Sequence, residues 1–144
     1  KANIEYTTPH GHVYRTDHKG RIKEVYADDL SLLDGGRNSY AQRTVGREDR
    51  LPDDDGGHLI ARVFGGSKDI DNLVPQSKYI NRSFKENGEW YNMEKEWREA
   101  IESEDQVKNI KIEVQYRGDS QRPTEFQVEY EINNRQYEKR IPNI

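Results

Sequence analysis

The chain is organised around the stretch Asp53-Asp54-Asp55-Gly56-Gly57-His58-Leu59-Ile60, which is followed by Asp71-Asn72-Leu73-Val74-Pro75-Gln76 and then by Asn81-Arg82. Two consecutive glycines before a histidine let the backbone bend sharply and leave the imidazole accessible. An accessible imidazole with a pKa near ~6.5 can act as a general base around neutral pH. Taken alone, a histidine in this setting is more often an ordinary turn residue, so the residues downstream must decide between the two interpretations.

The clearest helix expected from the sequence covers residues 88–103. A stripe of apolar residues at 100° per residue predicts that this helix buries one face. The stripe comprises Trp90, Met93, Trp97, Ala100 and Ile101. Glu94 lies four residues after Trp90 and three before Trp97, at the edge of the same stripe. An unpaired buried carboxylate costs several kcal/mol, so Glu94 needs a partner.

Asn81 and Glu94 together supply the oxygen ligands that Mg²⁺ prefers, because this ion keeps several waters and takes only one or two protein ligands. Each residue also has a structural interpretation. Asn81 is of a type that often caps the N-terminus of a helix, and Glu94 could form a buried ion pair with an arginine.

Alternating polar and apolar residues predict an antiparallel pair of strands over residues 110–116 and 126–132, each with one solvent-exposed face. Residues 12–26 have the pattern of a hairpin around an Asp- and Gly-containing turn. A last strand is expected at 136–140, after the turn formed by Asn133-Asn134.

Between residues 27 and 57 the periodicity fades, which predicts irregular backbone with a short helical turn near 38–44. Long irregular segments of this kind are often functional. We therefore expect an α+β fold with an antiparallel sheet and one main helix at about 88–103.

Composition restricts the function classes. The chain has 144 residues, with 23 Lys and Arg against 27 Asp and Glu, so its net charge is -4 and any site for nucleic acid must be local. It has no cysteine, which excludes disulfides, thiolate zinc sites and a cysteine nucleophile. No apolar run approaches the ~18–20 residues of a membrane span. We expect one domain over 1–144, and the start at Lys1 suggests a piece excised from a longer protein.

These ordered motifs resemble the DNA/RNA non-specific endonucleases of the ββα-metal (His-Me finger) fold. Members carry an Asp-Arg-Gly-His motif, an Asn-(Met/Leu/Ile)-(Val/Thr)-Pro-Gln segment, a metal-binding Asn and a Trp-x-x-x-Glu sequence on the following helix. The corresponding stretches here are Asp55-Gly56-Gly57-His58, Asn72-Leu73-Val74-Pro75-Gln76, Asn81 and Trp90-Tyr91-Asn92-Met93-Glu94. Residues 36–101 look closer still to the nuclease toxin domains that end type VII secreted LXG-type polymorphic toxins, and this similarity spans nearly the whole chain.

The resemblance implies a role for each candidate. His58 would be the general base that deprotonates a water for in-line attack on a phosphodiester, and Asn81 would hold one Mg²⁺ or another divalent cation such as Mn²⁺. Glu94 would orient metal-bound waters from just outside the ligand set. Products would then carry 5′ phosphates. The segment Ser83–Glu89 looks longer than in simpler members, which favours this indirect role for Glu94.

Substrate contacts are expected from several residues. The arginine of the family motif is replaced by Gly56, so the arginines that flank the motif must contact phosphate instead, since guanidinium suits bidentate binding. The candidates are Arg43, Arg47, Arg50 and Arg62. Asn72 and Gln76 of the Asn-Leu-Val-Pro-Gln segment complete the expected substrate-binding set.

The expected partners are nucleic acid, mainly DNA with RNA as a second substrate, and a cognate immunity protein that covers or deforms the cleft. The toxin resemblance implies a secreted effector that acts in the cytoplasm of a target bacterium and is held inactive by the immunity protein in the producer. Two alternatives stay open. One is a metal-independent ribonuclease in which His58 pairs with a second histidine such as His12. The other is a non-catalytic interaction domain in which the motif residues are caps and turns.

Overall fold

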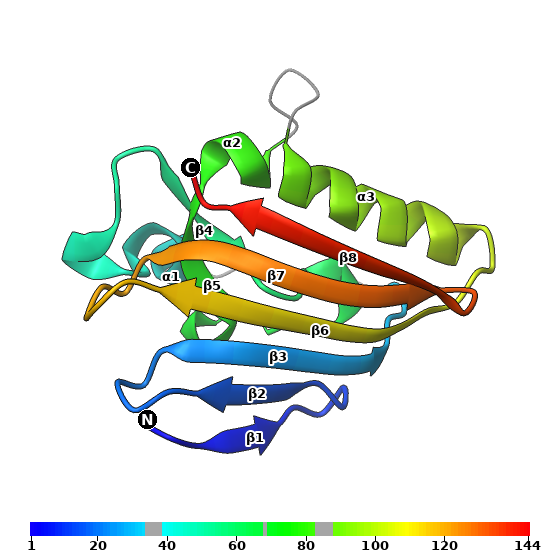
Figure 1. Cartoon of the computed structure of the whole chain (residues 1–144), viewed down its shortest axis with the longest axis horizontal. Helices are drawn as coiled ribbons and strands as arrows, with labels where there is room; N and C mark the ends of the chain where they lie inside the picture. The colour runs from blue at the N-terminus through cyan, green and yellow to red at the C-terminus, as the bar shows by residue number, and fades with distance from the viewer. Residues whose placement is uncertain (34–38, 68, 83–87) are drawn as a thin grey trace.

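The computed structural model describes residues 1–144 except 34–38, 68 and 83–87, and contains two antiparallel sheets (Figure 1). The larger sheet has six strands in the order β1-β2-β3-β6-β7-β8, and the smaller one pairs β4 with β5. The strands of the larger sheet are β1 (Glu5–Thr7), β2 (Val13–Thr16), β3 (Ile22–Asp29), β6 (Val107–Tyr116), β7 (Pro123–Ile132) and β8 (Arg135–Pro142). The smaller sheet contains β4 (Asp54–His58) and β5 (Leu73–Ser77).

The alternation of the C-terminal third predicted its strands correctly. β6 and β7 pair with Ile112 opposite Val128 and Val114 opposite Phe126, and all four side chains are buried. The strands extend beyond the predicted limits, and β8 continues the sheet after the turn at Asn133-Asn134, whose two asparagines both have positive φ. The hairpin predicted within 12–26 is confirmed as β2 and β3.

Helix α3 (Glu89–Glu102) confirms the predicted main helix and covers the buried face of the larger sheet. Trp90, Met93 and Trp97 are completely buried. Trp97 packs edge-on against Tyr130 of β7, with ring centroids 5.3 Å apart, and Trp90 lies 5.0 Å from the Phe126 ring. Each buried aromatic side chain contributes about 2–3 kcal/mol by burial alone, so a few aromatic residues compensate for the small apolar fraction of this chain.

The prediction for residues 27–57 is only partly correct. Its helical turn is present as α1 (Ser39–Thr44), although residue 38 lies outside the described residues, and β3 continues to Asp29. The end of the segment forms strand β4 instead of irregular backbone. Glycine and aspartate are poor strand formers, so β-propensity could not predict β4. Pairing with β5 and close contact with α1 make the strand, because a Cβ atom at Gly56 would lie 2.2 Å from the carbonyl oxygen of Gln42.

Strands β4 and β5 are followed directly by the short helix α2 (Lys78–Asn81), which gives the ββα arrangement expected within an α+β fold. Buried polar side chains join this unit to the larger sheet. Asn72 accepts a 2.6 Å hydrogen bond from the Tyr14 hydroxyl on β2 and donates one of 2.7 Å to the Ile60 carbonyl after β4. Asn143, after β8, accepts from the Ser77 amide at 2.7 Å and donates to the Pro75 carbonyl at 3.1 Å. The two sheets are therefore fixed relative to each other on both sides of β5.

No helix in the part of the chain that the structure describes is long and apolar enough to span a membrane.

Candidate active site

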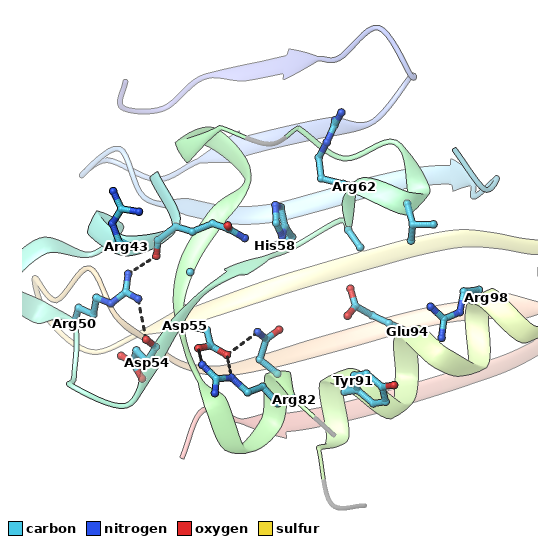
Figure 2. Close-up of a pocket in the computed structure, with 15 residues that line it drawn as sticks. Arg43, Arg50, Asp54, Asp55, His58, Arg62, Arg82, Tyr91, Glu94 and Arg98 are labelled. Carbon is cyan, nitrogen blue, oxygen red and sulfur yellow. Dashed lines mark hydrogen bonds and ion pairs between the residues drawn. The ribbon is translucent and has the colours of Figure 1, made fainter. Parts of the chain in front are cut away.

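A cavity of about 970 Å³ opens beside β4 and brings together residues from several parts of the chain (Figure 2). His58 comes from the end of β4, Asn81 from the end of α2 and Glu94 from the middle of α3. Residues of α1 and of the segment after Ile60 complete its wall. The three residues predicted to carry the chemistry thus line one cavity, although 36 sequence positions separate the first from the last.

His58 is placed by the glycine pair that precedes it. A Cβ atom at Gly57 would lie 2.3 Å from Oε1 of Gln76 on the paired strand, so only glycine allows the close approach of β4 to β5. β4 ends at His58, and its half-buried side chain enters the cavity rather than the core (Figure 2). The glycine pair therefore sets the strand geometry that presents the imidazole, but it does so as extended backbone inside β4, so the sharp bend expected from the sequence is absent, and the Nε2 atom of His58 is buried.

Asn81 is held in one orientation by Asp55. Its Nδ2 donates a 3.0 Å hydrogen bond to Oδ2 of Asp55. Because an ionised carboxylate only accepts hydrogen bonds, the amide nitrogen must face Asp55, and the carbonyl oxygen Oδ1 points to the other side of the amide. The N-cap of α2 is Ser77, whose hydroxyl accepts from the Tyr79 amide, while Asn81 ends the helix. The N-cap interpretation of Asn81 is therefore wrong.

Asp55 also binds Arg82 in a two-pronged ion pair. Nε of Arg82 donates to Oδ2 at 2.9 Å, and a terminal guanidinium nitrogen donates to Oδ1 at 2.6 Å. Burial raises the pKa of Asp55, but the hydrogen bonds from Arg82 and Asn81 outweigh this effect and hold the pKa below its ordinary value. Asp55 is thus ionised at neutral pH. Its position in the Asp-Gly-Gly-His stretch was visible in the sequence, whereas its pairing with Arg82 was not.

Glu94 lies at the edge of the apolar stripe of α3, where it borders the cavity. Burial raises the pKa of Glu94 to about 8, while the indole of Trp90 and the positive charge of Arg98 act in the opposite direction. Arg98 lies one turn further along α3 and lines the same cavity. Arg98 acts on Glu94 through its charge alone, and among the described residues Glu94 does not form the arginine ion pair that its structural interpretation required.

The comparisons with known proteins agree with this geometry. Residues 2–134 match the family model described as DNA/RNA non-specific endonuclease. The chain belongs to this family. It is 76% identical over 143 residues to the type VII secretion system protein EssD of Staphylococcus aureus strain USA300, an alignment that covers 99% of this chain. The EssD protein of strain Newman matches to the same extent. The chain spans 23% of the length of these relatives.

Solved structures show the same fold. NucA from Streptococcus agalactiae with magnesium bound aligns with a TM-score of 0.72 at 19% identity, covering 99% of this chain and 74% of that one. The metal-free NucA structure aligns with a TM-score of 0.71 at 20% identity, covering 97% of this chain and 71% of the NucA chain. These structures show the fold, while the family match identifies the chain as a nuclease and so as a hydrolase.

Among the described residues, five arginines line the cavity of this endonuclease, and only some of those predicted are among them. The five are Arg43, Arg50, Arg62, Arg82 and Arg98. Arg47 is not; it lines a separate cavity beside β5, because Gly46 and Arg47 both adopt positive φ and turn the chain away. The prediction that Arg47 contacts substrate in this cavity is thus inconsistent with the structure. Sequence reasoning assigned no role to Arg82 or Arg98.

Two of the arginines that were predicted to bind phosphate donate hydrogen bonds to main-chain carbonyls instead. Arg50 donates to the carbonyls of Gln42 at 2.6 Å and Asp54 at 2.8 Å, and so ties α1 to β4. Arg62 donates to the carbonyl of Gly66. These contacts use donors that the sequence analysis assigned to phosphate.

Asn72 and Gln76 lie in the interior of the endonuclease, with no exposed surface. Both hydrogen-bonding groups of Asn72 are satisfied, since Oδ1 also accepts from the Ile60 amide at 3.1 Å and Nδ2 also donates to the Ser67 carbonyl at 2.8 Å. The Gln76 amide is packed against Gly57. Burial corrects the prediction that these two amides bind substrate, and their position indicates that they shape β4 and β5 instead.

The structure does not bring together the two histidines of the metal-independent ribonuclease alternative. His12 is only 3% exposed and does not line the cavity that contains His58. Burial and the neighbouring His10 lower the pKa of His12, with Asp29 acting in the opposite direction. An acid and base pair of His58 and His12 is therefore inconsistent with the fold. The longer segment 83–89 falls largely outside the described residues, which resume at Gly88.

The raised pKa of Glu94 predicts how stability depends on pH. A folded-state pKa of about 8, above the ordinary 4.5, means that the native state favours the protonated carboxyl. Stability is therefore retained below about pH 4.5 and decreases as pH rises toward 8. The Glu94→Gln protein, which resembles the protonated form, should melt about 5 °C above wild type at pH 9 without divalent metal, and close to wild type at pH 5.

The matched control is Glu99→Gln, which changes an exposed glutamate of the same helix. Thermal melts followed by circular dichroism should show no pH-dependent difference for this variant. Parallel pH profiles for wild type and Glu94→Gln would contradict the burial of the charge.

Proposed function

We propose that this domain is a Mg²⁺-dependent, sequence-non-specific endonuclease that hydrolyses phosphodiesters, mainly in DNA and also in RNA. The observation that carries the proposal is the convergence of His58, Asn81 and Glu94 on one arginine-lined cavity. Family membership and the fold shared with a magnesium-bound nuclease support it.

The residues of the cavity fit a hydrated Mg²⁺ ion. Among the described residues no three His, Cys, Asp or Glu side chains cluster to form a metal site. Mg²⁺ does not require such a cluster, because it keeps several waters and is bound through few protein oxygens. Oδ1 of Asn81, which the hydrogen bond to Asp55 turns away from the carboxylate, would hold the ion. The bound ion would supply positive charge near the phosphate and the leaving 3′ oxygen.

His58 would act as the general base. A neutral imidazole in the cavity can accept the proton of a water molecule as that water attacks the phosphorus in line with the leaving 3′ oxygen. The bond between phosphorus and the 3′ oxygen breaks, so the phosphate stays on the 5′ oxygen of the downstream nucleotide, and the leaving 3′ oxygen takes a proton from water to become a hydroxyl. His58 reaches this position from β4, whereas Asn81 approaches from α2, so water and phosphate would be held between the two elements.

Glu94 would orient water in the cavity. Its carboxyl group borders the space between α3 and β4, and its ionised form accepts hydrogen bonds from water. The positive charge of Arg98 favours this ionised form, and a nearby cation would favour it further. Glu94 is in this account a positioning residue that acts on waters.

The cavity also explains how an acidic protein can bind a polyanion. Its wall carries five arginines and three carboxylates, Asp54, Asp55 and Glu94. Asp54 is paired with Arg122, at 2.7 Å, outside the cavity wall. The local field is thus positive, while the whole chain carries a net charge of -4.

We further propose that the domain is the toxic part of a secreted effector, acts in the cytoplasm of a target bacterium and is restrained in the producer by a cognate immunity protein. The support is the 76% identity to EssD, a type VII secretion system protein. Induced expression of the domain in the bacterial cytoplasm should stop growth, and the His58→Ala protein should not. Equal growth with both would contradict the toxic role.

The nuclease proposal is tested by digesting plasmid DNA and a structured RNA with Mg²⁺ and with excess EDTA. Wild type should cleave only with Mg²⁺. The cleavage rate of His58→Ala should be about 10²–10⁴-fold lower, which is the usual contribution of a general base. His18→Ala is the matched control, because His18 is exposed in the turn before β3.

Cleavage that persists in EDTA, or full activity of His58→Ala with an unchanged melting temperature, would exclude the proposed mechanism. Absence of cleavage by wild type under all conditions would favour the non-catalytic interaction domain.

A further inference from the structure

Among the described residues, the guanidinium group of Arg82 is held along one of its edges. Nε and one terminal nitrogen bind the two oxygens of Asp55, at 2.9 and 2.6 Å. A guanidinium has five N–H donors in a fixed plane, and this side-on pair uses two of them. Three donors remain on the end of the group, and two of these belong to the other terminal nitrogen.

We propose that the free end of Arg82 binds a phosphate of the nucleic-acid backbone beside the scissile bond. The inference rests on the proposed nuclease function and assigns a phosphate subsite within it. Two parallel N–H donors match two non-bridging phosphate oxygens, so the end-on edge can form a second two-pronged contact while the side-on edge stays on Asp55.

The location of Arg82 favours this role. It follows Asn81 directly, and both side chains donate to the same oxygen of Asp55, at 3.0 Å from Asn81 and 2.9 Å from Arg82. Asp55 therefore fixes the guanidinium next to the amide that would hold the cation, as Figure 2 shows for the labelled Asp55 and Arg82. The Arg82 side chain is 63% exposed and lines the cavity, so a ligand can reach it.

Three other positions beside β4 are less suited to this contact, while Arg43 and Arg98 line the cavity from α1 and α3. No side chain fits at Gly56, where a Cβ atom would lie 2.2 Å from the Gln42 carbonyl oxygen. Arg50 donates to two main-chain carbonyls, and Arg62 donates to a third. Arg82 thus lies on the side of β4 next to Asn81, and in the described part of the chain its ion pair uses one edge of the guanidinium.

The Asp55 pair also makes the contact favourable on entropic grounds. A free arginine side chain loses rotamer entropy when it is fixed, and here the ion pair has already fixed the group. The Arg82 side of the pair is 63% exposed and the Asp55 side 17%, and such a partly exposed ion pair adds little to folding stability. Replacing Arg82 should therefore weaken binding without unfolding the protein.

The test is binding of a fluorescein-labelled 20-mer DNA duplex, measured by anisotropy in EDTA so that no cleavage occurs. Arg82→Ala should weaken binding by about tenfold, which is the effect of losing one charge-assisted contact. The slope of log affinity against log salt concentration should fall in magnitude by about one, because one counterion fewer is released on binding. Arg82→Lys should recover only part of the affinity, because an ammonium lacks the planar fork.

Arg140→Ala is the matched control. Arg140 on β8 is 72% exposed and forms the same side-on pair with Glu125, at 2.7 and 2.8 Å, but does not line the cavity. The affinity of the Arg140→Ala protein for the DNA duplex should stay within twofold of wild type. With Mg²⁺ added, Arg82→Ala should raise KM more than it lowers kcat, since the contact is made to the bound substrate as well as during the reaction.

Two results would overturn the assignment. One is an Arg82→Ala protein that binds like wild type, and the other is an equal loss for Arg82→Ala and Arg140→Ala, which would indicate a general charge effect. A wild-type protein that binds the duplex but does not cleave it with Mg²⁺ would instead contradict the proposed hydrolysis.

Discussion

The hydrogen bonds to the Asp55 carboxylate are the interaction on which the rest of the site depends. One oxygen accepts from both Asn81 and Arg82, so a single charge orients a candidate metal ligand and a candidate phosphate ligand. The carboxylate can do this because its pKa is held below the ordinary range by the same two donors. Asp55 is in turn fixed by strand β4, whose glycines allow α1 and β5 to approach closely. The geometry of the site therefore depends directly on how the backbone packs around β4.

Charge is distributed unevenly in the fold. Arginines line the cavity, whereas on the surface of β6, β7 and β8 the carboxylates Glu113, Glu129 and Glu138 lie beside Lys139 and Arg140. The arginines at the cavity let an acidic chain present a local positive field to a polyanion. Buried polar links, including Asn72 and Asn143, hold the ββα unit against the larger sheet and keep the cavity in shape.

Periodicity predicted the elements that have a single buried face. The apolar stripe of α3 and the alternation of β6 and β7 both match the structure, because burial itself imposes those patterns. β4 has no such pattern, and it forms only because β5 and α1 surround it. Short β1 was missed for a related reason, since its three residues are too few to show alternation.

The order of the motifs predicted which residues meet at the cavity, but not which polar groups are free. Asn72 has the chemistry of a ligand, yet its four hydrogen bonds are all internal. Arg82 pairs with a residue 27 positions away, and no sequence spacing reveals that contact. Tertiary structure decides whether a polar side chain is satisfied by the protein or left for a substrate.

The central claim is that Asn81 and His58 face one hydrated cation. The most direct measurement is anomalous scattering from crystals soaked in Mn²⁺, which substitutes for Mg²⁺. The account predicts one strong peak in the cavity, at direct ligand distance of about 2 Å from Oδ1 of Asn81, and loss of this peak in Asn81→Ala. A cavity without a peak, or a peak that persists in Asn81→Ala, would contradict it.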